Sequence, residues 1–343
     1  MQQSIYIGTY TQGSSEGIYE YSGGALKLAA PLVNPSYFIF NKNRTLAYAV
    51  SETQEFQGAN GGAAASFTVA SDGSLKQTAI LPTFGKDPCH LCLSSDEKAL
   101  FVANYTEGTL CRYTLNDSGA LEEMPEIARH HGHGPNPDRQ EGPHIHFVTL
   151  CPGHPQKLWT VDLGLDAIFV YGTGVGALSA PLFRFPVPSG YGPRHIAFHP
   201  VLPLAYVVQE LANRILTISI DENGLPGQIL DDISTLPPHW EGYSKAAAIR
   251  CSQDGAALYV SNRGHESIAA YRLTSDGIPH LTEFAPTGGI SPRDIILTDH
   301  DRKILCAHQD GGGVTAISID QEGHLSKPST AIQADAPVCL QIF

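Results

Sequence analysis

The chain has 343 residues, of which 42% are hydrophobic, and this length allows either one large all-β domain or two domains of ordinary size. Its formal net charge is -13, with only 21 basic residues, which argues against nucleic acid as a partner because phosphate contacts require clustered lysine and arginine. Charged residues make up 16% of the chain, whereas glycine (34) and proline (24) are frequent, so turns are abundant.

The beginning of the chain leads directly from Met1 into an apolar strand, with no basic or apolar leader, so we expect no signal peptide. No apolar run reaches the length of a membrane-spanning helix, and we expect no membrane association. The seven cysteines have no disulfide spacing, and Cys89 and Cys92 form a C-x-x-C pair without a second pair at zinc spacing. Free thiols suit a reducing compartment, which favours a cytoplasmic protein.

A proline followed by an apolar strand recurs along the chain at intervals of about 50 residues. Most copies continue with a polar turn, a second apolar strand, an alternating third strand, and an Asp-Gly or similar turn before a fourth. The proline position is occupied, in chain order, by Pro35, Pro88, Pro143, Pro193, Ser244, Pro292 and Pro337. Four strands in about 50 residues are typical of a β-propeller blade.

The last blade is split between the two ends of the chain. Residues 5–28 resemble a second, third and fourth strand, and residues 336–343 supply the missing first strand. We therefore predict one all-β domain over residues 1–343, a seven-bladed β-propeller with four antiparallel strands per blade, closed by pairing the C-terminal strand with the N-terminal three. Two segments, 54–64 and 126–141, are predicted to be irregular.

Polar residues gather at two kinds of position in the repeat. Because successive strands are antiparallel, the start of each first strand and the end of each second strand lie on the same side of a blade. These positions hold His144, His146, Arg194, His195, Arg293, Asn104, Glu210, Arg263 and Gln309, with Arg139 in the approach to the third blade. Arginines collected in an acidic chain indicate a site for an anion, although polar residues at a channel mouth can also serve only buried backbone groups and water.

The histidine pair His144 and His146 opens the third blade. On a regular strand, residues two apart point the same way, and an imidazole titrates near neutral pH, so the pair is a candidate for proton transfer. Zinc binding by this pair or by residues 130–133 would need further ligands at metal spacing, which we do not find; we expect no metal and no cofactor, and residues 130–133 at the surface. Residues 13–17 match G-x-S-x-G but fall in a predicted loop between strands, so we expect a turn rather than a nucleophile elbow.

The chain resembles the lactonase family of seven-bladed propellers, which includes bacterial 6-phosphogluconolactonases of the pentose phosphate pathway and, more distantly, fungal carboxy-cis,cis-muconate cyclases. The similarity runs along the whole chain. It is carried by residues 8–11, 17–19, 34–36, 139–146, 192–195, 209–210, 260–265 and 292–293. By motif, the resemblance implies that His146, Arg194, Glu210 and Arg263 are catalytic. The chain departs from the family pattern at Ile145, where proline is usual, and at Ala248 and Arg250, where relatives carry a carboxylate and an imidazole.

We therefore expect hydrolysis of a sugar-acid lactone, 6-phosphogluconolactone or a related aldonolactone, by water that His146 or Glu210 activates. Arg194 and Arg263 would polarise the carbonyl, and Arg139 with Arg293 would hold a phosphate or carboxylate. The remaining expected substrate contacts are His144, His195, Asn104 and Gln309. A muconate-type cycloisomerase and a non-catalytic binding or scaffold propeller are the alternatives. The only expected partner is a small anionic substrate, and the chain would be a monomer or a weak homodimer.

Overall fold

The computed structural model describes residues 4–122 and 124–343. Contacts divide the chain into two compact units: unit 1 extends to Gly192 and includes Phe343, and unit 2 covers Pro193–Ile342. Among the described residues the only helical element is one short 3₁₀ turn, η1 (Ala177–Ser179), and every other element is a β-strand. The predicted all-β class is therefore confirmed.

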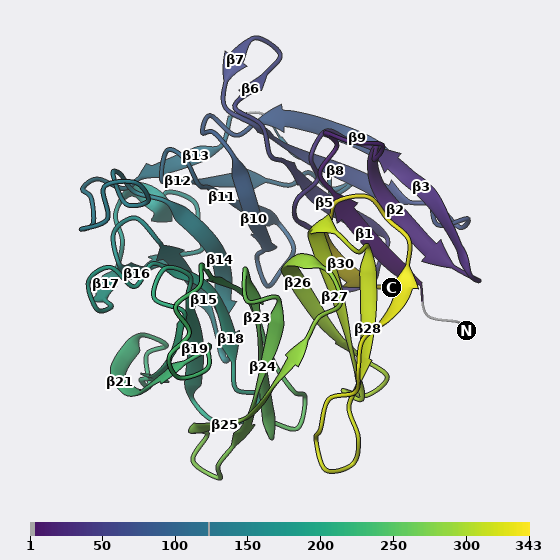
Figure 1. Ribbon diagram of the computed structural model, residues 1–343. Coiled ribbons are helices and arrows are strands. Elements are labelled where there is room, and N and C mark those ends of the chain that lie inside the picture. Colours follow the sequence, from purple (N-terminus) through teal and green to yellow (C-terminus); the bar gives the residue numbers. More distant parts are fainter. Residues whose placement is uncertain (1–3, 123) are drawn as a thin grey trace. The chain divides into compact units, whose positions relative to one another are not determined.

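Unit 1 contains three complete four-stranded antiparallel sheets and three strands of a fourth (Figure 1). The first complete sheet is made of β4 (Phe38–Phe40), β5 (Leu46–Ser51), β8 (Ala63–Val69) and β9 (Leu75–Pro82). The second is made of β10 (Pro88–Leu93), β11 (Ala99–Asn104), β12 (Thr109–Thr114) and β13 (Glu126–Arg129). The third is made of β14 (Ile145–Cys151), β15 (His154–Asp162), β16 (Ala167–Gly172) and β17 (Phe183–Pro186). The partial sheet contains β1 (Ile5–Thr9), β2 (Gly17–Ser22) and β3 (Ala25–Pro31).

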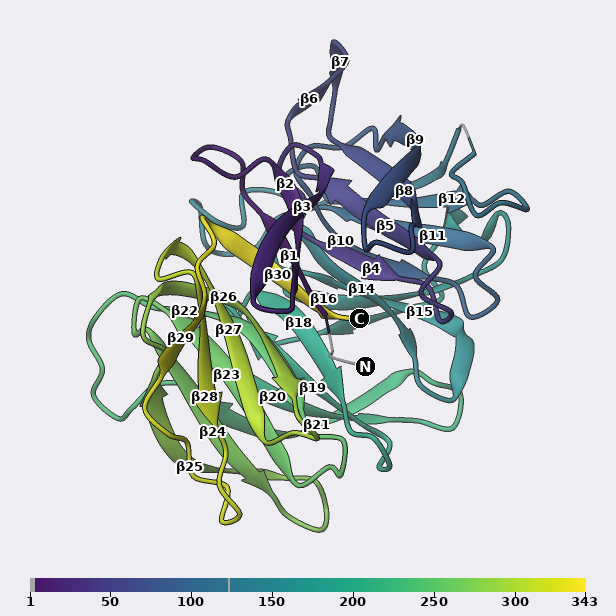
Figure 2. The same ribbon diagram turned by 90° about the vertical axis from the view of Figure 1, so that its right-hand side faces the viewer.

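Unit 2 contains three further complete sheets, which Figure 2 shows with their strands labelled. The first is made of β18 (Pro193–Phe198), β19 (Leu204–Gln209), β20 (Arg214–Ile220) and β21 (Pro226–Ser234). The second is made of β22 (Lys245–Cys251), β23 (Ala257–Arg263), β24 (Ser267–Leu273) and β25 (Pro279–Pro286). The third is made of β26 (Ile290–Thr298), β27 (Lys303–Gly311), β28 (Val314–Ser318) and β29 (Ser329–Ile332).

The last strand, β30 (Pro337–Ile342), completes the partial sheet, whose strand order is β3-β2-β1-β30. The amide of Phe343 donates to the carbonyl of Ser4 at 2.9 Å. The predicted pairing of the C-terminal strand with the N-terminal three is confirmed, and with it the pattern of seven four-stranded sheets.

Second strands are buried on both faces, as the two-residue period of a strand requires when sheets stack. In β11, Phe101 and Ala103 pack into the apolar cluster shared with the β14–β17 sheet, whereas Leu100 and Val102 pack into the cluster shared with the β4–β9 sheet. Fourth strands such as β9 and β21 are largely exposed. The β10–β13 sheet is therefore held from both sides within unit 1, and β11 is a rigid support for the residues that follow it.

Buried tyrosines in second strands connect one sheet to the next. The hydroxyl of Tyr48 donates to the carbonyl of Gly119 at 2.8 Å, and that of Tyr206 donates to Gly277 at 2.7 Å. Both glycines have a positive φ in the turn between the third and fourth strands of the following sheet, a conformation that favours glycine. Burial and the nearby Glu97 raise the pKa of Tyr48 to about 12, so the phenol stays protonated and can donate.

Two segments predicted to be irregular contain strands, and these predictions were wrong in part. Residues 54–64 form a small hairpin from β6 (Glu55–Phe56) and β7 (Ala59–Asn60), which stands out from unit 1 in Figure 1. In residues 126–141, the first four form β13, the fourth strand of its sheet. Short strands in polar sequence carry too little apolar periodicity to be predicted, and pairing with a neighbour decides their conformation.

Candidate functional site

A β-bulge recurs near the start of the first strand in five sheets. At each bulge the first strand has one residue more than the second, which locally bends the strand and re-aims a side chain; in β22 two residues, Ala247 and Ala248, lie opposite Ser261. The bulged positions are Cys89, His146, Arg194, the pair Ala247–Ala248, and Arg293. Three residues predicted to be functional thus occupy equivalent irregular positions, and the regular strand geometry expected for His144 and His146 was wrong.

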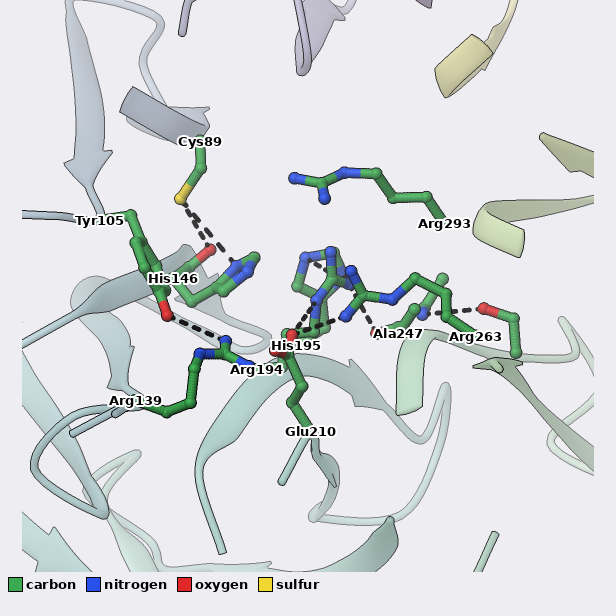
Figure 3. A network of polar contacts seen from close by, with 12 residues as sticks. Cys89, Tyr105, Arg139, His146, Arg194, His195, Glu210, Ala247, Arg263 and Arg293 are labelled. Atoms are coloured by element: carbon green, nitrogen blue, oxygen red, sulfur yellow. Dashed lines mark hydrogen bonds and ion pairs between the residues drawn. The ribbon is translucent and has the colours of Figure 1, made fainter. Parts of the chain in front are cut away.

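In unit 2, two arginines converge on one carboxylate; we call Arg194, Arg263 and Glu210 the arginine cluster. Arg194 lies at the bulge of β18, Glu210 follows the end of β19, and Arg263 ends β23. The Nε atom of Arg194 lies 3.0 Å from Oε2 of Glu210, and Nη2 of Arg263 lies 2.8 Å from the same oxygen. Figure 3 shows the carboxylate with both guanidinium groups beside it. Arg194 and Glu210 are each 2% exposed, so their charges depend on this pairing.

Arg194 makes further contacts with two first strands of unit 2, and Arg293 contacts a second strand. Arg194 Nη1 donates to the carbonyl of Ala247 at 2.7 Å and lies 3.2 Å from Nε2 of His195. Arg293, at the bulge of β26, donates from Nη1 to Oε1 of Gln309 at 3.2 Å. The predicted residues Arg194, His195, Glu210 and Arg263 are therefore brought together within unit 2, and Arg293 forms a separate pair with Gln309.

In unit 1, three predicted residues surround a tyrosine; we call Tyr105, Arg139, His144 and His146 the tyrosine cluster. Nη2 of Arg139 donates to the hydroxyl of Tyr105 at 3.1 Å, as Figure 3 shows. The ring of His144 stacks on Tyr105 at a centroid distance of 4.5 Å and an angle of 10°. The ring of His146 meets it edge-on at 5.3 Å and 78°. Arg139 and both histidines are thus brought together, around a residue that the sequence analysis did not select.

Both histidines of this cluster are buried and held by neighbouring groups. The backbone amide of His144 donates to Oδ1 of Asp162 at 2.7 Å, and its Nε2 lies 3.2 Å from Oε1 of Glu141. His146 is 6% exposed, and its Nδ1 lies 3.9 Å from Sγ of Cys89, whose thiol donates to the His146 carbonyl at 3.5 Å. The imidazole of His146 is therefore buried between the thiol of Cys89 and the edge of the Tyr105 ring.

Similarity to known proteins agrees with this arrangement of strands. Residues 4–342 match the family described as "Lactonase, 7-bladed beta-propeller". The chain belongs to this lactonase family. A Bacillus subtilis protein named 6-phosphogluconolactonase is 32% identical over 98% of the chain and 97% of its own length. The seven four-stranded sheets are the seven blades of the family fold, and the predicted enzyme class, a lactone hydrolase, is confirmed.

Solved structures of similar proteins cover the entire chain. A putative 6-phosphogluconolactonase from Bacteroides fragilis superimposes with a TM-score of 0.89 and 27% identity, over 100% of this chain and 98% of its own. A periplasmic gluconolactonase from Pseudomonas aeruginosa gives a TM-score of 0.90 at 28% identity, over 100% and 99% of the two chains. A protein from Lactobacillus plantarum gives 0.90 at 29% identity, with both chains fully covered.

Two residues of this lactonase have surroundings that the sequence did not reveal. Asn104 is fully buried, and its Nδ2 donates to Oγ1 of Thr109 at 2.8 Å and to the carbonyl of Thr83 at 3.3 Å. These contacts anchor the end of β11. The role of Asn104 in substrate binding stays a prediction. His130 was expected at the surface, and this was wrong. It is 7% exposed, and its Nδ1 donates to Oδ2 of Asp162 at 2.6 Å.

The two departures from the family pattern in β22 have a simple structural setting. Ala248 is fully buried at the bulge, where its small side chain packs between sheets. Arg250 pairs with Asp294 of the next first strand, with Nη2 to Oδ1 at 2.7 Å, and Asp294 in turn accepts the amide of Leu340 at 2.9 Å. Arg250 thus belongs to a contact between sheets and not to the arginine cluster.

In residues 4–122 and 124–343, no three His, Cys, Asp or Glu side chains are grouped as a metal site would require. A search of the same residues finds no helix that is long and apolar enough to cross a membrane. The G-x-S-x-G match lies in the loop between β1 and β2, as predicted.

Proposed function

We propose that this lactonase hydrolyses the lactone of a sugar acid, with 6-phosphogluconolactone as the first candidate and unphosphorylated gluconolactone as the second. The arginine cluster carries the proposal: an acidic chain keeps two guanidinium groups on one buried carboxylate. Such a group of fixed charges suits an anionic substrate and the negative charge that develops when a lactone carbonyl is attacked. The names of the Bacillus, Bacteroides and Pseudomonas relatives agree with this substrate class.

Glu210 and His146 are the two candidates for the general base, and their contacts favour His146. Glu210 shares one oxygen between two guanidinium groups, which stabilises the ionised carboxylate and makes it a poor proton acceptor. His146 contacts the thiol of Cys89 and the edge of the Tyr105 ring in unit 1, and an imidazole titrates near neutral pH. We therefore assign proton transfer to His146, and to Glu210 the orientation of Arg194 and Arg263.

The remaining residues are proposed to bind substrate. Arg139 and Arg293 would hold the phosphate or carboxylate, because a guanidinium can present two parallel donors to such a group. His144 and His195 would contact the sugar hydroxyls together with Gln309, whose amide oxygen accepts a hydrogen bond from Arg293. Lactone opening then consumes one water and yields a single product molecule that carries a carboxylic acid and a hydroxyl group.

The decisive experiment compares a panel of lactones, phosphorylated and not, with a muconate as the alternative substrate. We expect the purified protein to hydrolyse sugar-acid lactones faster than the spontaneous reaction, and to prefer the phosphorylated lactone if Arg139 and Arg293 bind phosphate. A preference for gluconolactone would replace the first candidate by the second. Cyclisation of the muconate without lactone hydrolysis, or no turnover of any member, would refute the proposal.

A further inference from the structure

Tyr105 lies at the centre of the tyrosine cluster although it belongs to none of the motifs that the chain shares with its family. It follows directly after β11, in the turn to β12, and is partly exposed. Three predicted site residues touch it: Arg139 through a hydrogen bond of 3.1 Å, and His144 and His146 through their rings. In Figure 3, its hydroxyl points to the guanidinium of Arg139. A residue that contacts three others of a site is placed to share their chemistry.

The backbone of Tyr105 is fixed from three directions. Its amide donates to the carbonyl of Asp87 at 3.0 Å, and its carbonyl accepts the amide of Gly108 at 3.2 Å. The same carbonyl lies 3.0 Å from Nδ1 of His144, so that nitrogen carries a proton and donates. Stacking on the His144 ring fixes the side chain as well. A donor held in this way needs little reorganisation when charge develops, which is the condition for efficient electrostatic catalysis.

The contact with Arg139 determines what the phenol can do. A guanidinium only donates, so the oxygen of Tyr105 accepts in this bond and the phenolic proton serves as a donor to another group. A hydrogen bond received from a cation polarises the O–H bond and strengthens the hydrogen bond that it makes. The cluster therefore combines a polarised donor with His146, the proposed base.

We propose that Tyr105 is a catalytic residue whose hydroxyl donates a hydrogen bond to the carbonyl oxygen of the lactone; this inference rests on the proposed function. Water attacks the carbonyl carbon while its proton passes to His146, and the carbonyl π electrons move onto the oxygen that Tyr105 stabilises. Collapse of this intermediate breaks the ring C–O bond, and the proton on His146 passes to the departing ring oxygen. Tyr105 keeps its proton throughout, so its contribution is electrostatic.

The test compares Tyr105→Phe with Tyr105→Ala. Phenylalanine keeps the ring that stacks on His144 and removes only the hydroxyl. We expect kcat of Tyr105→Phe to fall by about 10²–10³, the usual cost of losing one oxyanion donor, with KM changed by less than about threefold. The double variant Tyr105→Phe/Arg139→Gln should have the kcat of Tyr105→Phe, because polarisation by Arg139 acts through the hydroxyl.

Tyr113→Phe is the matched control. Tyr113 lies in β12 of the same sheet, is fully buried, and donates its hydroxyl to the carbonyl of Pro82 at 2.6 Å. Its loss should lower the melting temperature and leave kcat unchanged.

Three outcomes can be told apart. A large loss of kcat in Tyr105→Phe, with an unaltered melting temperature, supports the catalytic role. Full activity in Tyr105→Phe together with an impaired Tyr105→Ala would overturn it, because the ring alone would then account for the contacts. If the wild-type protein hydrolyses no lactone, the proposed function fails and this inference fails with it, whereas an active wild type separates the two.

Discussion

The arginine cluster of unit 2 and the tyrosine cluster of unit 1 are built from different chemistry on the same structural device. Both are anchored at a bulge in a first strand, at Arg194 in one case and His146 in the other. In the arginine cluster two cations share one buried anion, and both Arg194 and Arg263 form an ion pair with Oε2 of Glu210. In the tyrosine cluster His146 meets the ring of Tyr105 edge-on, its Nδ1 lies near the thiol of Cys89, and its carbonyl accepts from that thiol.

This difference separates two tasks that a lactone hydrolase must perform. Fixed charges in a buried place stabilise negative charge without reorganisation, but they exchange no protons at neutral pH. Imidazole can gain and lose a proton near neutrality, but it provides little fixed charge. We therefore expect substitutions in the arginine cluster to affect both stability and turnover, and substitutions of His146 to affect turnover alone.

Arg194→Ala should have the largest effect. It leaves the buried Glu210 with Arg263 as its remaining partner in the cluster, and breaking a buried pair costs about 3–5 kcal/mol of the free energy of unfolding. We expect kcat/KM to fall by about 10³ or more, since one oxyanion donor alone is worth 10²–10³. Chemical denaturation and lactone kinetics measure the two effects.

Arg272→Ala is the control for this variant. Arg272 is exposed in β24 of the same unit, and its Nη2 donates to the carbonyl of Glu322 at 3.2 Å. Its removal should cost less than about 0.5 kcal/mol and leave turnover unchanged. Equal stability of the two variants would show that the arginine cluster is not a buried charge network.

His146→Gln should come next. Glutamine keeps a polar side chain of similar size but cannot act as a base, so kcat should fall by about 10²–10³ while the melting temperature changes little. The loss of activity at acidic pH, which titration of the imidazole predicts for the wild type, should disappear from the pH–rate profile of the variant. Parallel losses of stability and turnover would contradict the division of tasks between the clusters.

Asp162→Asn should have a smaller and different effect. Oδ1 of Asp162 accepts the amide of His144 at 2.7 Å, and Oδ2 accepts Nδ1 of His130 at 2.6 Å. An asparagine can keep only one of these bonds, so the start of β14 should shift slightly. Because His144 is proposed to bind substrate, we expect KM to rise about tenfold with a nearly constant kcat, the reverse of His146→Gln.

A loss confined to kcat would place Asp162 in proton transfer instead. His130→Gln tests whether the effect comes through His130, and it should leave KM closer to the wild-type value.

The fold was predictable because its signal repeats. Each of the first strands follows a proline or its equivalent, each second strand is apolar on both faces, and errors in one copy are corrected by the others. Even the pairing of β30 with β1 could be predicted from the missing strand at the N-terminus. Single features without a repeat, such as the β6–β7 hairpin and β13, were missed.

The site was predictable in its residue types but not in its contacts. The motifs predicted Arg194, Glu210 and Arg263, and the direction of the strands predicted that these residues lie at the same end of their sheets. The bulges depend on how a first strand pairs with a second, which no local pattern records. Tyr105 was missed because it lies in none of the family motifs and its contacts with Arg139 and His144 form only in the fold. His130 was missed because burial of a histidine in a Gly- and Pro-rich segment depends on a distant partner, Asp162.

His308→Asn should have the smallest effect, on stability and not on turnover. His308 is fully buried in β27, and burial lowers its pKa below the usual 6.5, while its Nδ1 donates to the carbonyl of Gly313 at 3.1 Å. The unfolded chain therefore binds a proton that the folded chain does not, so this histidine's contribution is complete above about pH 7 and is lost as the pH falls through 6.5 toward the lower folded value. Asparagine can keep the donor to Gly313 without titrating. We expect the fall in the free energy of unfolding between pH 7.5 and 5.0 to be smaller in the variant than in the wild type. Burial also lowers the pKa of His265, which remains in both proteins, so the pH dependence should weaken without vanishing.

The exposed His239 gives the control, because His239→Asn should leave the pH dependence as in the wild type. If both variants behaved alike, the acid sensitivity would have to come from His265 or from carboxylates such as Glu210.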